Sequence, residues 1–251
     1  MKAMIFAAGL GTRLKPLTDT MPKALVPLAG KPLLQWQVEK LRDAGITDII
    51  VNVHHFPDMI IDAVRIHQGW GCNISISDER DCLLDTGGGL RKTISNDQRL
   101  TTNDPILACN VDILSNIDIP ALIDAYEQSG ISQLVVSDRS TQRYLCFDDQ
   151  NTLCGWTNIA TGELKGQDGR HLAFSGMQIL SPDALALLAT MPEGKFSLID
   201  FYLRTMQRAP FRAYVPANYQ MMDVGKINEI EKAERFAALL VSPERLELST
   251  H

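Results

Sequence analysis

A short apolar strand that runs directly into a glycine-rich loop is the feature that most constrains this chain. Residues 3–8 read A-M-I-F-A-A, which is long enough for one buried parallel strand. Gly9 and Gly11 follow, and because glycine has no Cβ, backbone N–H groups there can approach a phosphate closely. Arg13 and Lys23 then supply two cations from an irregular segment that contains several prolines. A glycine loop with two cations beside it is typical of a nucleoside triphosphate site.

Two well-known phosphate loops do not fit this stretch. A dinucleotide-binding fold needs G-x-G-x-x-G, but Leu14 occupies the third glycine position. A Walker loop needs G-x-x-x-x-G-K-[ST], and neither Gly9 nor Gly11 offers that spacing. An ordinary surface turn would explain G-L-G-T-R alone, but not the ordered P-K and G-K-P that follow.

These residues resemble the N-terminal motif of the sugar-phosphate nucleotidylyltransferases. The motif is G-L-G-T-R-L at residues 9–14, P-K at 22–23 and G-K-P at 30–32, and the resemblance extends to about residue 240. It implies an α/β, Rossmann-like single domain with a mixed, mostly parallel central sheet, the nucleotide-diphospho-sugar transferase or GT-A-like fold. It also implies a reaction in which a nucleoside triphosphate is joined to a sugar 1-phosphate and pyrophosphate is released.

The composition argues against a nucleic-acid binder, a membrane protein and a disulfide-stabilised fold. The formal net charge of -6 differs from the basic face with which general nucleic-acid binders neutralise phosphates. No window approaches the ~18 uninterrupted apolar residues of a membrane span. An odd number of cysteines without a C-x-x-C pair indicates free thiols in a reducing cytoplasm, at Cys72, Cys82, Cys109, Cys146 and Cys154. We expect a cytoplasmic monomer or small homo-oligomer with no nucleic-acid or membrane partner.

Strands and helices alternate through the first half of the chain. Strands are expected at residues 3–8, 48–53 and 73–77, with a helix from Pro32 to the stop at Gly45 and another over 56–66. This order predicts parallel strands with right-handed crossovers, which places the first glycine loop at a carboxyl end of the sheet, where ligands bind.

Two adjacent histidines, His54 and His55, close the second expected strand. Adjacent strand residues point to opposite faces, so the pair is poorly placed to share one ion. We favour structural roles for both.

A second glycine run, T-G-G-G at residues 86–89, stands at the start of a helix that ends near Ser95. Bare backbone there allows amide N–H and C=O groups to read the edge of a flat ring. In the resembled family the equivalent loop contacts the base, and T-G-G-G is similar to the N-acetylmuramate 1-phosphate uridylyltransferase branch. The alternative is an ordinary turn that begins a helix. The resemblance implies a nucleotide site formed by Ala8, Gly9, Gly11, Thr12, Arg13, Lys23, Thr86, Gly87 and Gly88.

Two aspartates are candidates for a magnesium site. Asp112 comes just after an expected strand at 105–109, where a carboxylate can hold Mg²⁺, although a lone aspartate there is also a common turn residue. The resemblance implies that Asp223, in M-M-D-V-G, shares one Mg²⁺ with it. Val111 replaces the glycine usual in the family, and this leaves the local backbone shape open because valine disfavours positive φ.

The acceptor sugar is assigned to the second half of the chain. We expect a hairpin-like piece from Tyr144 to Trp156, and the family strand that lines the sugar pocket contains Gly176. Asn110 and Lys165 are further sugar-site candidates, although Glu163-Leu164-Lys165 departs from the Glu-Lys-Pro of longer relatives.

These assignments give one nucleotidyltransferase domain over residues 1–240. The nucleotide-binding half is 1–138, the acceptor-sugar half is 139–225, and a closing helix occupies 226–240. Residues 241–251 have little pattern, and we expect a loose tail.

The implied chemistry needs charge neutralisation and alignment, and it uses no covalent nucleophile. Arg13 and Lys23 are the catalytic candidates, with Mg²⁺ on Asp112 and Asp223. The base and the sugar stay open. Alternatives are a cytidylyl- or guanylyltransferase acting on phosphocholine, heptose 1-phosphate or mannose 1-phosphate, a catalytically silent homologue that binds a nucleotide sugar, and, less favoured, a dinucleotide oxidoreductase.

Overall fold

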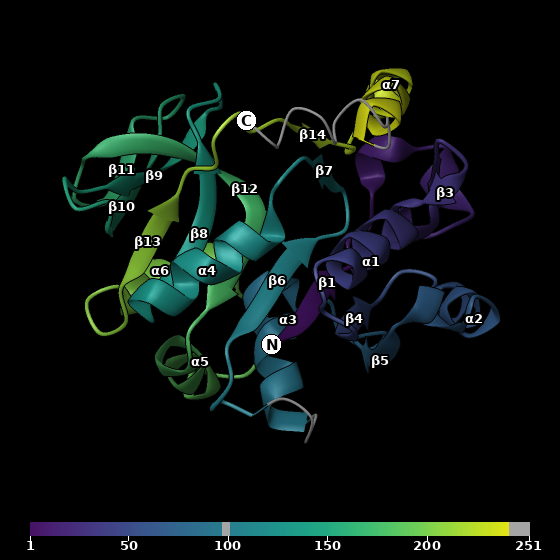
Figure 1. The fold of residues 1–251 in the computed structure, drawn as a ribbon, viewed down its shortest axis with the longest axis horizontal. Coiled ribbons are helices and arrows are strands. Elements are labelled where there is room, and N and C mark those ends of the chain that lie inside the picture. The colour runs from purple at the N-terminus through teal and green to yellow at the C-terminus, as the bar shows by residue number, and fades with distance from the viewer. Residues whose placement is uncertain (97–100, 241–251) are drawn as a thin grey trace.

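One ten-stranded sheet forms the centre of the molecule (Figure 1). The structure, a computed structural model, describes residues 1–96 and 101–240, so the expected tail lies outside the described residues. The strand order is β11-β10-β9-β12-β6-β1-β4-β5, and β8 joins both β12 and β13. The strands are β1 (Lys2–Phe6), β4 (Asp48–Val53), β5 (Asn73–Asp78), β6 (Ile106–Asn110), β8 (Ser132–Ser137), β9 (Arg143–Phe147), β10 (Leu153–Asn158), β11 (Glu163–Gly166), β12 (Arg170–Leu180) and β13 (Phe211–Tyr214).

The N-terminal half of the sheet is parallel, as the sequence predicts. Strands β5, β4, β1 and β6 run in the same direction, with α1 (Leu33–Asp43) between β1 and β4 and α2 (Pro57–Ile66) between β4 and β5. The register places Ile5 opposite Val51 and Cys109, which explains the apolar runs in all three strands. Helix α1 begins one residue later than expected, because Pro32 is extended and serves as its N-cap.

The C-terminal half of the sheet is antiparallel, apart from the parallel β8–β13 pair. Strand β12 runs antiparallel to β6, β8 and β9, and β10 pairs antiparallel with both β9 and β11. The mixed sheet is therefore confirmed, and its parallel character is concentrated in the first half. Strands β9 and β10 form the hairpin expected from the pattern near residues 144–156.

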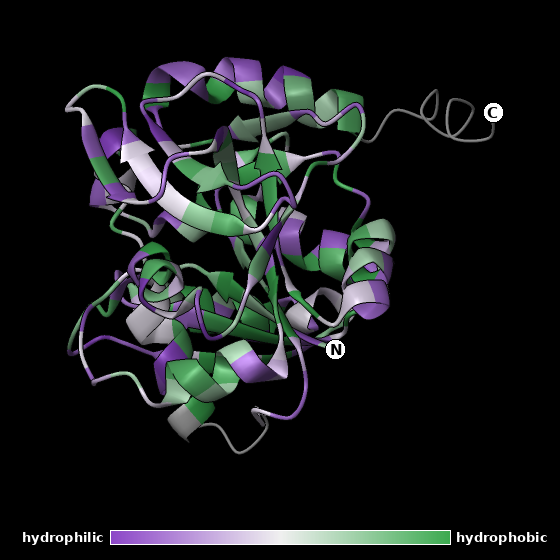
Figure 2. Ribbon diagram, turned by 90° about the vertical axis from the view of Figure 1, so that its left-hand side faces the viewer, coloured by the Kyte–Doolittle hydropathy of each residue, from purple (hydrophilic) through white to green (hydrophobic). Residues whose placement is uncertain are grey.

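Helices cover both faces of the sheet and bury one apolar core on each (Figure 2). One core contains residues of α1, α2 and α4 (Ile119–Ser129), and α7 (Ile230–Leu240) extends it over β2 and β7. The other core contains residues of α3 (Asp85–Asn96), α5 (Pro182–Ala189) and α6 (Leu198–Thr205). Two small sheets, β2 (Pro27–Leu28) with β3 (Lys31–Pro32) and β7 (Ile113–Ser115) with β14 (Met221–Asp223), lie outside the large one. No helix within residues 1–96 and 101–240 has the length and apolar character needed to cross a membrane.

Candidate active site

The first glycine loop folds so that Lys23 packs against Gly11. Gly11 has a φ of 63°, in the left-handed region that favours glycine, and Thr18 Oγ1 donates to its carbonyl at 2.9 Å. A Cβ at Gly11 would lie 2.8 Å from Thr18 Cγ2 and 3.0 Å from Lys23 Cβ, so a side chain there would push the loop open. Thr12 and Arg13 follow on an exposed 3₁₀ turn.

A nearly buried ion pair joins this loop to the end of β6. Lys23 Nζ pairs with Asp112 Oδ2, and the two side chains are 10% and 18% exposed. Val111 lies between β6 and Asp112. Its φ lies outside the left-handed region, its side chain is buried, and its N–H donates to the Phe6 carbonyl at 3.2 Å. Valine is therefore compatible with the backbone at this position, and the loop keeps Asp112 beside the glycine loop.

The second carboxylate reaches the same place through the small β7–β14 sheet. Asp223 pairs with Ile113 in register, and the Val224 N–H donates to the Asp112 carbonyl at 2.8 Å. Arg13 Nη2 lies 3.9 Å from Asp223 Oδ2. Burial raises the pKa of Asp223, and the negative charge of Asp112 raises it further, while Lys23 and Arg13 lower it. Two cations and two carboxylates, far apart in the sequence, thus meet at one end of the sheet.

Gly225 packs directly against this cluster, which sequence reasoning missed. A Cβ there would lie 2.6 Å from Asp223 Oδ1 and 2.8 Å from Arg13 Nη2. The signal was the glycine that follows shortly after Asp223 in M-M-D-V-G, because a glycine has no Cβ and allows a close approach.

We expect Gly225→Ala to lower turnover while leaving the fold intact. The φ of Gly225 lies outside the left-handed region, so alanine fits the backbone, but its methyl group displaces Arg13 and Asp223. Misplacement on the order of 1 Å can cost about a hundredfold in rate. Steady-state kinetics measure the loss, with Lys226→Ala as the neighbouring control. Turnover equal to that of the control would show that the Arg13–Asp223 geometry does not matter for catalysis.

Of the three residues expected in the sugar site, Gly176 and Asn110 are brought together, whereas Lys165 lies elsewhere. Gly176 has a φ of 73° at a register shift in β12, and a Cβ there would lie 3.0 Å from Asn110 Nδ2. Lys165 lies on the edge strand β11, which β10 and β9 separate from β12 by roughly 14 Å. Its ammonium pairs with Glu163 at 3.4 Å and lies over the Trp156 ring.

The T-G-G-G run is covered by another segment of the chain. The N–H groups of Gly87 and Gly88 both donate to the Phe196 carbonyl, at 2.9 and 3.1 Å, and a Cβ at Gly88 would lie 2.2 Å from the Gly194 carbonyl oxygen. The expectation that these two amides are free to read a ring is therefore wrong. The glycines are needed because the 194–196 segment approaches α3 so closely.

Thr86 lies next to a small cavity at the end of β1. Its hydroxyl accepts from the Leu198 N–H at 3.0 Å. The cavity has a volume of about 190 Å³ and contains two of the expected nucleotide residues besides Thr86 in its wall, which is formed by Phe6, Ala8, Gly9, Asn52, Leu83, Asp85, Thr86 and Lys195.

A buried polar network behind this cavity was also missed. Asn52 accepts from the Ala7 N–H at 2.8 Å and donates to Glu79 Oε1 at 2.8 Å, and Glu79 Oε2 accepts from the Leu84 N–H at 3.1 Å. Glu79 and Asn52 are 1% and 2% exposed. The network joins the end of β1 to the loop before α3. Its signal was an asparagine inside the apolar strand D-I-I-V-N-V.

We expect Glu79 to make the protein less stable as the pH rises from 4.5 toward its folded-state pKa. Burial raises this pKa above the ordinary value of 4.5, against the lowering effects of Asn52 and Leu84. In that window the folded state holds more protons than the unfolded chain, so the free energy of unfolding falls with rising pH, and the contribution levels off above the folded pKa. Urea unfolding at a series of pH values measures the slope.

Glu79→Gln removes this titration and should flatten the slope, whereas the exposed Glu231→Gln should not. An identical slope in wild type and Glu79→Gln would show that the folded-state pKa of Glu79 is not raised.

The two histidines have separate structural partners, as expected. His54 Nδ1 lies 2.7 Å from the Glu79 carbonyl oxygen, and His55 Nε2 lies 3.1 Å from the Thr18 carbonyl oxygen. They therefore stabilise different loops around the site.

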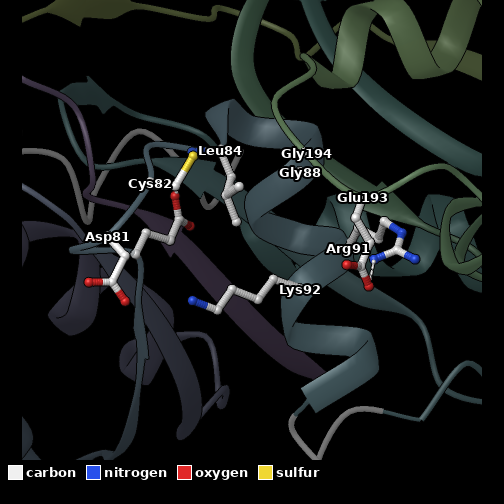
Figure 3. Close-up of a pocket in the computed structure, with 9 residues that line it drawn as sticks. Asp81, Cys82, Leu84, Gly88, Arg91, Lys92, Glu193 and Gly194 are labelled. Carbon is white, nitrogen blue, oxygen red and sulfur yellow. Dashed lines mark hydrogen bonds and ion pairs between the residues drawn. The ribbon is translucent and has the colours of Figure 1, made fainter.

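A larger cavity of about 280 Å³ lies on α3 next to this network (Figure 3). Arg91 Nη1 pairs with Glu193 at 3.3 Å across one side, and Lys92 Nζ donates to the Asp78 carbonyl. Its wall is formed by Glu79, Asp81, Cys82, Leu84, Gly88, Arg91, Lys92, Glu193 and Gly194.

Comparison with known proteins decides the family. The family model described as Nucleotidyl transferase matches residues 2–146, which is more than half of the chain. The chain belongs to the nucleotidyl transferase family. Within this family it is similar to N-acetylmuramate alpha-1-phosphate uridylyltransferase of Caulobacter vibrioides, with 32% identity over 80% of this chain and 83% of that protein.

Two further matches show the range of the family. The chain is 32% identical to the mannose-1-phosphate guanyltransferase of Debaryomyces hansenii over 76% of this chain and 53% of that protein. The crystal structure of HddC from Yersinia pseudotuberculosis complexed with GMP-PN matches 94% of this chain and 99% of that chain, with a TM-score of 0.73 and 24% identity. That likeness supports the nucleotidyl transferase fold.

Proposed function

We propose that this protein transfers a uridylyl group from UTP to N-acetylmuramate 1-phosphate and releases pyrophosphate. Membership of the nucleotidyl transferase family supports the reaction class, and the similarity to the Caulobacter vibrioides uridylyltransferase over most of both chains supports the substrates. The observation that carries the proposal is the meeting of Asp112 and Asp223 with Lys23 and Arg13 at one end of the sheet.

In this reaction a phosphate oxygen of the sugar 1-phosphate attacks the α-phosphorus of the triphosphate. A new P–O bond forms while the bond to the β-phosphate breaks, and the electron pair leaves with pyrophosphate. Arg13 extends from an exposed turn and is placed to neutralise charge that develops on the phosphates. Lys23, which packs against Gly11, is placed to neutralise the same charge. The attacking phosphate is already ionised, so no general base is required.

We also propose that Asp112 and Asp223 hold Mg²⁺. Carboxylate oxygens suit this hard cation, and the pairing of Asp223 with Ile113 and of the Val224 N–H with the Asp112 carbonyl supports a shared site for the two carboxylates. Asp112 has further lone pairs besides the one used by Lys23. When bound, Mg²⁺ would supply charge stabilisation for the transferring phosphoryl group.

The nucleoside is assigned to the cavity beside Ala8, Gly9 and Thr86, with Gly11 and Thr12 on the phosphate side. Gly87 and Gly88 contribute by shaping the first turn of α3, which carries Thr86, because their amides are used by Phe196. The sugar is assigned to the neighbourhood of Asn110 and Gly176, and Lys165 is not included.

This proposal divides the domain as expected from the sequence. Residues 1–138 bind the nucleotide, 139–225 the acceptor, and 226–240 close the domain. We propose a cytoplasmic enzyme, monomeric or a small homo-oligomer, that uses neither nucleic acid nor membrane. The net charge of -6 and the free cysteines support this.

A guanylyltransferase acting on mannose 1-phosphate is the second candidate, because of the 32% identity to the Debaryomyces hansenii enzyme. A matrix of UTP, dTTP, GTP and CTP against the 1-phosphates of N-acetylmuramate, mannose, glucose and heptose separates the two by pyrophosphate release. We expect UTP with N-acetylmuramate 1-phosphate to give the highest kcat/KM. A maximum with GTP and mannose 1-phosphate would favour the second candidate, and no release with any pair would overturn both.

A further inference from the structure

Three metal-ligating side chains of different types gather in the acceptor half, away from the carboxylate pair. Cys146 is buried on β9, His171 lies at the start of β12, and Asp168 lies in the segment between β11 and β12. His171 Nε2 lies 2.7 Å from Asp168 Oδ1, and Cys146 Sγ lies 3.9 Å from the same oxygen. One ligand atom from each residue lies within 4.8 Å of the other two.

The sheet register builds this cluster. Cys146 and His171 are direct partners in the antiparallel β9–β12 ladder, so their side chains stand next to each other on one face of the sheet. Tyr144 stacks on the His171 ring at 5.6 Å between centroids and orients the imidazole. The backbone register therefore places the thiol and imidazole side chains next to each other, and the Tyr144 ring favours the observed orientation of the imidazole.

Three glycines allow the segment that carries Asp168 to lie close to Cys146 and His171. A Cβ built at Gly155 would lie 2.2 Å from the Gln167 carbonyl oxygen. A Cβ at Gly166 would lie 2.5 Å from a carbonyl oxygen of β10, and a Cβ at Gly169 would lie 2.4 Å from the Phe147 carbonyl oxygen. Only bare backbone allows the 166–169 segment to lie this close to the β9–β10 hairpin. As a result Asp168 is held over Cys146.

We propose that Cys146, Asp168 and His171 bind a zinc-class divalent cation. A thiolate, an imidazole and a carboxylate form a donor set that suits Zn²⁺, whereas Mg²⁺ takes oxygen ligands. Bond lengths to tetrahedral zinc imply separations between ligand atoms of about 3.4–3.6 Å. The 3.9 Å separation between Cys146 Sγ and Asp168 Oδ1 is slightly longer than that range, and the 2.7 Å separation between His171 Nε2 and Asp168 Oδ1, a hydrogen bond, is shorter. Binding therefore requires a small shift of the exposed Asp168 and His171 side chains. Binding replaces the thiol proton, which leaves to solvent.

The fourth position is open to a water molecule. Cys154, whose Sγ lies 3.3 Å from the Cys146 carbonyl oxygen and 3.8 Å from the Asp168 carbonyl oxygen, is the next thiol along the hairpin. Asp168 and His171 are 67% and 38% exposed, so the cation can reach the site from solvent. Occupancy would join the hairpin, the 166–169 segment and β12 into one stiff unit.

Titration of the purified full-length protein with Co²⁺, as a spectroscopic probe for zinc, tests the proposal. We expect one equivalent to produce a thiolate-to-cobalt charge-transfer band that Zn²⁺ abolishes by competition. Co²⁺ at Asp112 and Asp223 would contribute no such band, because no thiol is among those proposed ligands. The readout is therefore independent of nucleotidyl transfer and of the proposed substrates.

Variants in the cluster decide which residues bind. Cys146→Ser should abolish the band. Asp168→Asn and His171→Gln, at exposed positions, should each weaken Co²⁺ binding by more than the roughly 10–100-fold that loss of an outer-shell partner costs. Cys109→Ser and His67→Gln, a buried thiol and an imidazole elsewhere, should leave both unchanged. Cys154→Ser reports whether the fourth ligand is a thiolate or water.

Absence of the band in the wild-type protein would overturn the proposal. So would full affinity in both folded surface variants, since these report on the site even where Cys146→Ser fails to fold. In either case His171 and Asp168 would form an ordinary ion pair.

Discussion

Replacing Asp112 with asparagine is expected to lower turnover on the order of a thousandfold. The change removes one of the two carboxylates proposed to hold Mg²⁺, whose charge stabilisation is worth several kcal/mol, at about 1.4 kcal/mol per tenfold in rate. It also leaves the ammonium of Lys23 without its partner in a nearly buried position. Breaking such a pair costs about 3 kcal/mol of unfolding free energy. Steady-state kinetics and urea unfolding measure the two effects.

A double variant separates catalysis from folding. Lys23→Met with Asp112→Asn removes both charges, so unfolding free energy should recover most of the loss while turnover stays low. Near wild-type turnover in the folded single variant would remove Asp112 from the metal site. No recovery of stability in the double variant would contradict the Lys23–Asp112 pair.

Replacing Arg13 with alanine is expected to lower kcat by about a hundredfold or more, with a smaller effect on triphosphate binding. A charge-assisted donor aimed at developing negative charge is worth roughly 2.7–4 kcal/mol in comparable sites. The Arg13 side chain is 58% exposed, so stability should change little. Kinetics of pyrophosphate release and calorimetric binding of the triphosphate measure the two quantities.

Lys15→Ala is the matched control for Arg13, because Lys15 is a similarly exposed cation on the same loop and pairs only weakly with Asp19. It should retain nearly full activity. A different result would contradict this role: an unchanged kcat in Arg13→Ala, with triphosphate affinity falling as much as kcat/KM. Arg13 would then bind the triphosphate in the ground state, and another group would stabilise the transition state.

Local patterns predicted the first half of the fold well. The strand at residues 48–53 agrees with β4, and the other expected strands and helices end within a few residues of the structure. Each of these segments carries its own apolar period and its own stop signal, so no distant contact is needed to recognise it. The approach of Asp223 to Asp112, by contrast, is a long-range contact, and only the family resemblance implied it.

Features that depend on packing between distant segments of the chain could not be predicted from the sequence. Nothing near Gly88 shows that Gly194 will lie against it, and a glycine that admits another segment looks the same as one that admits a ligand. Likewise Glu79 meets Asn52 only because β4 and β5 are neighbours and α3 covers them. Lys165 was placed by chain position, but the hairpin carries it to the outer edge.

The position of β12 determines how this protein can enclose its substrates. This one strand is hydrogen-bonded to β6 of the parallel part of the sheet and also to β8 and β9 of the antiparallel part. A hinge that moved the halves as rigid bodies would have to break part of a continuous backbone ladder, at about 1 kcal/mol for each hydrogen bond. We therefore expect any closure around the substrates to involve the surface loops at the ends of the strands. The segment that carries Arg13 is one such loop, and the segment that covers Gly88 is another.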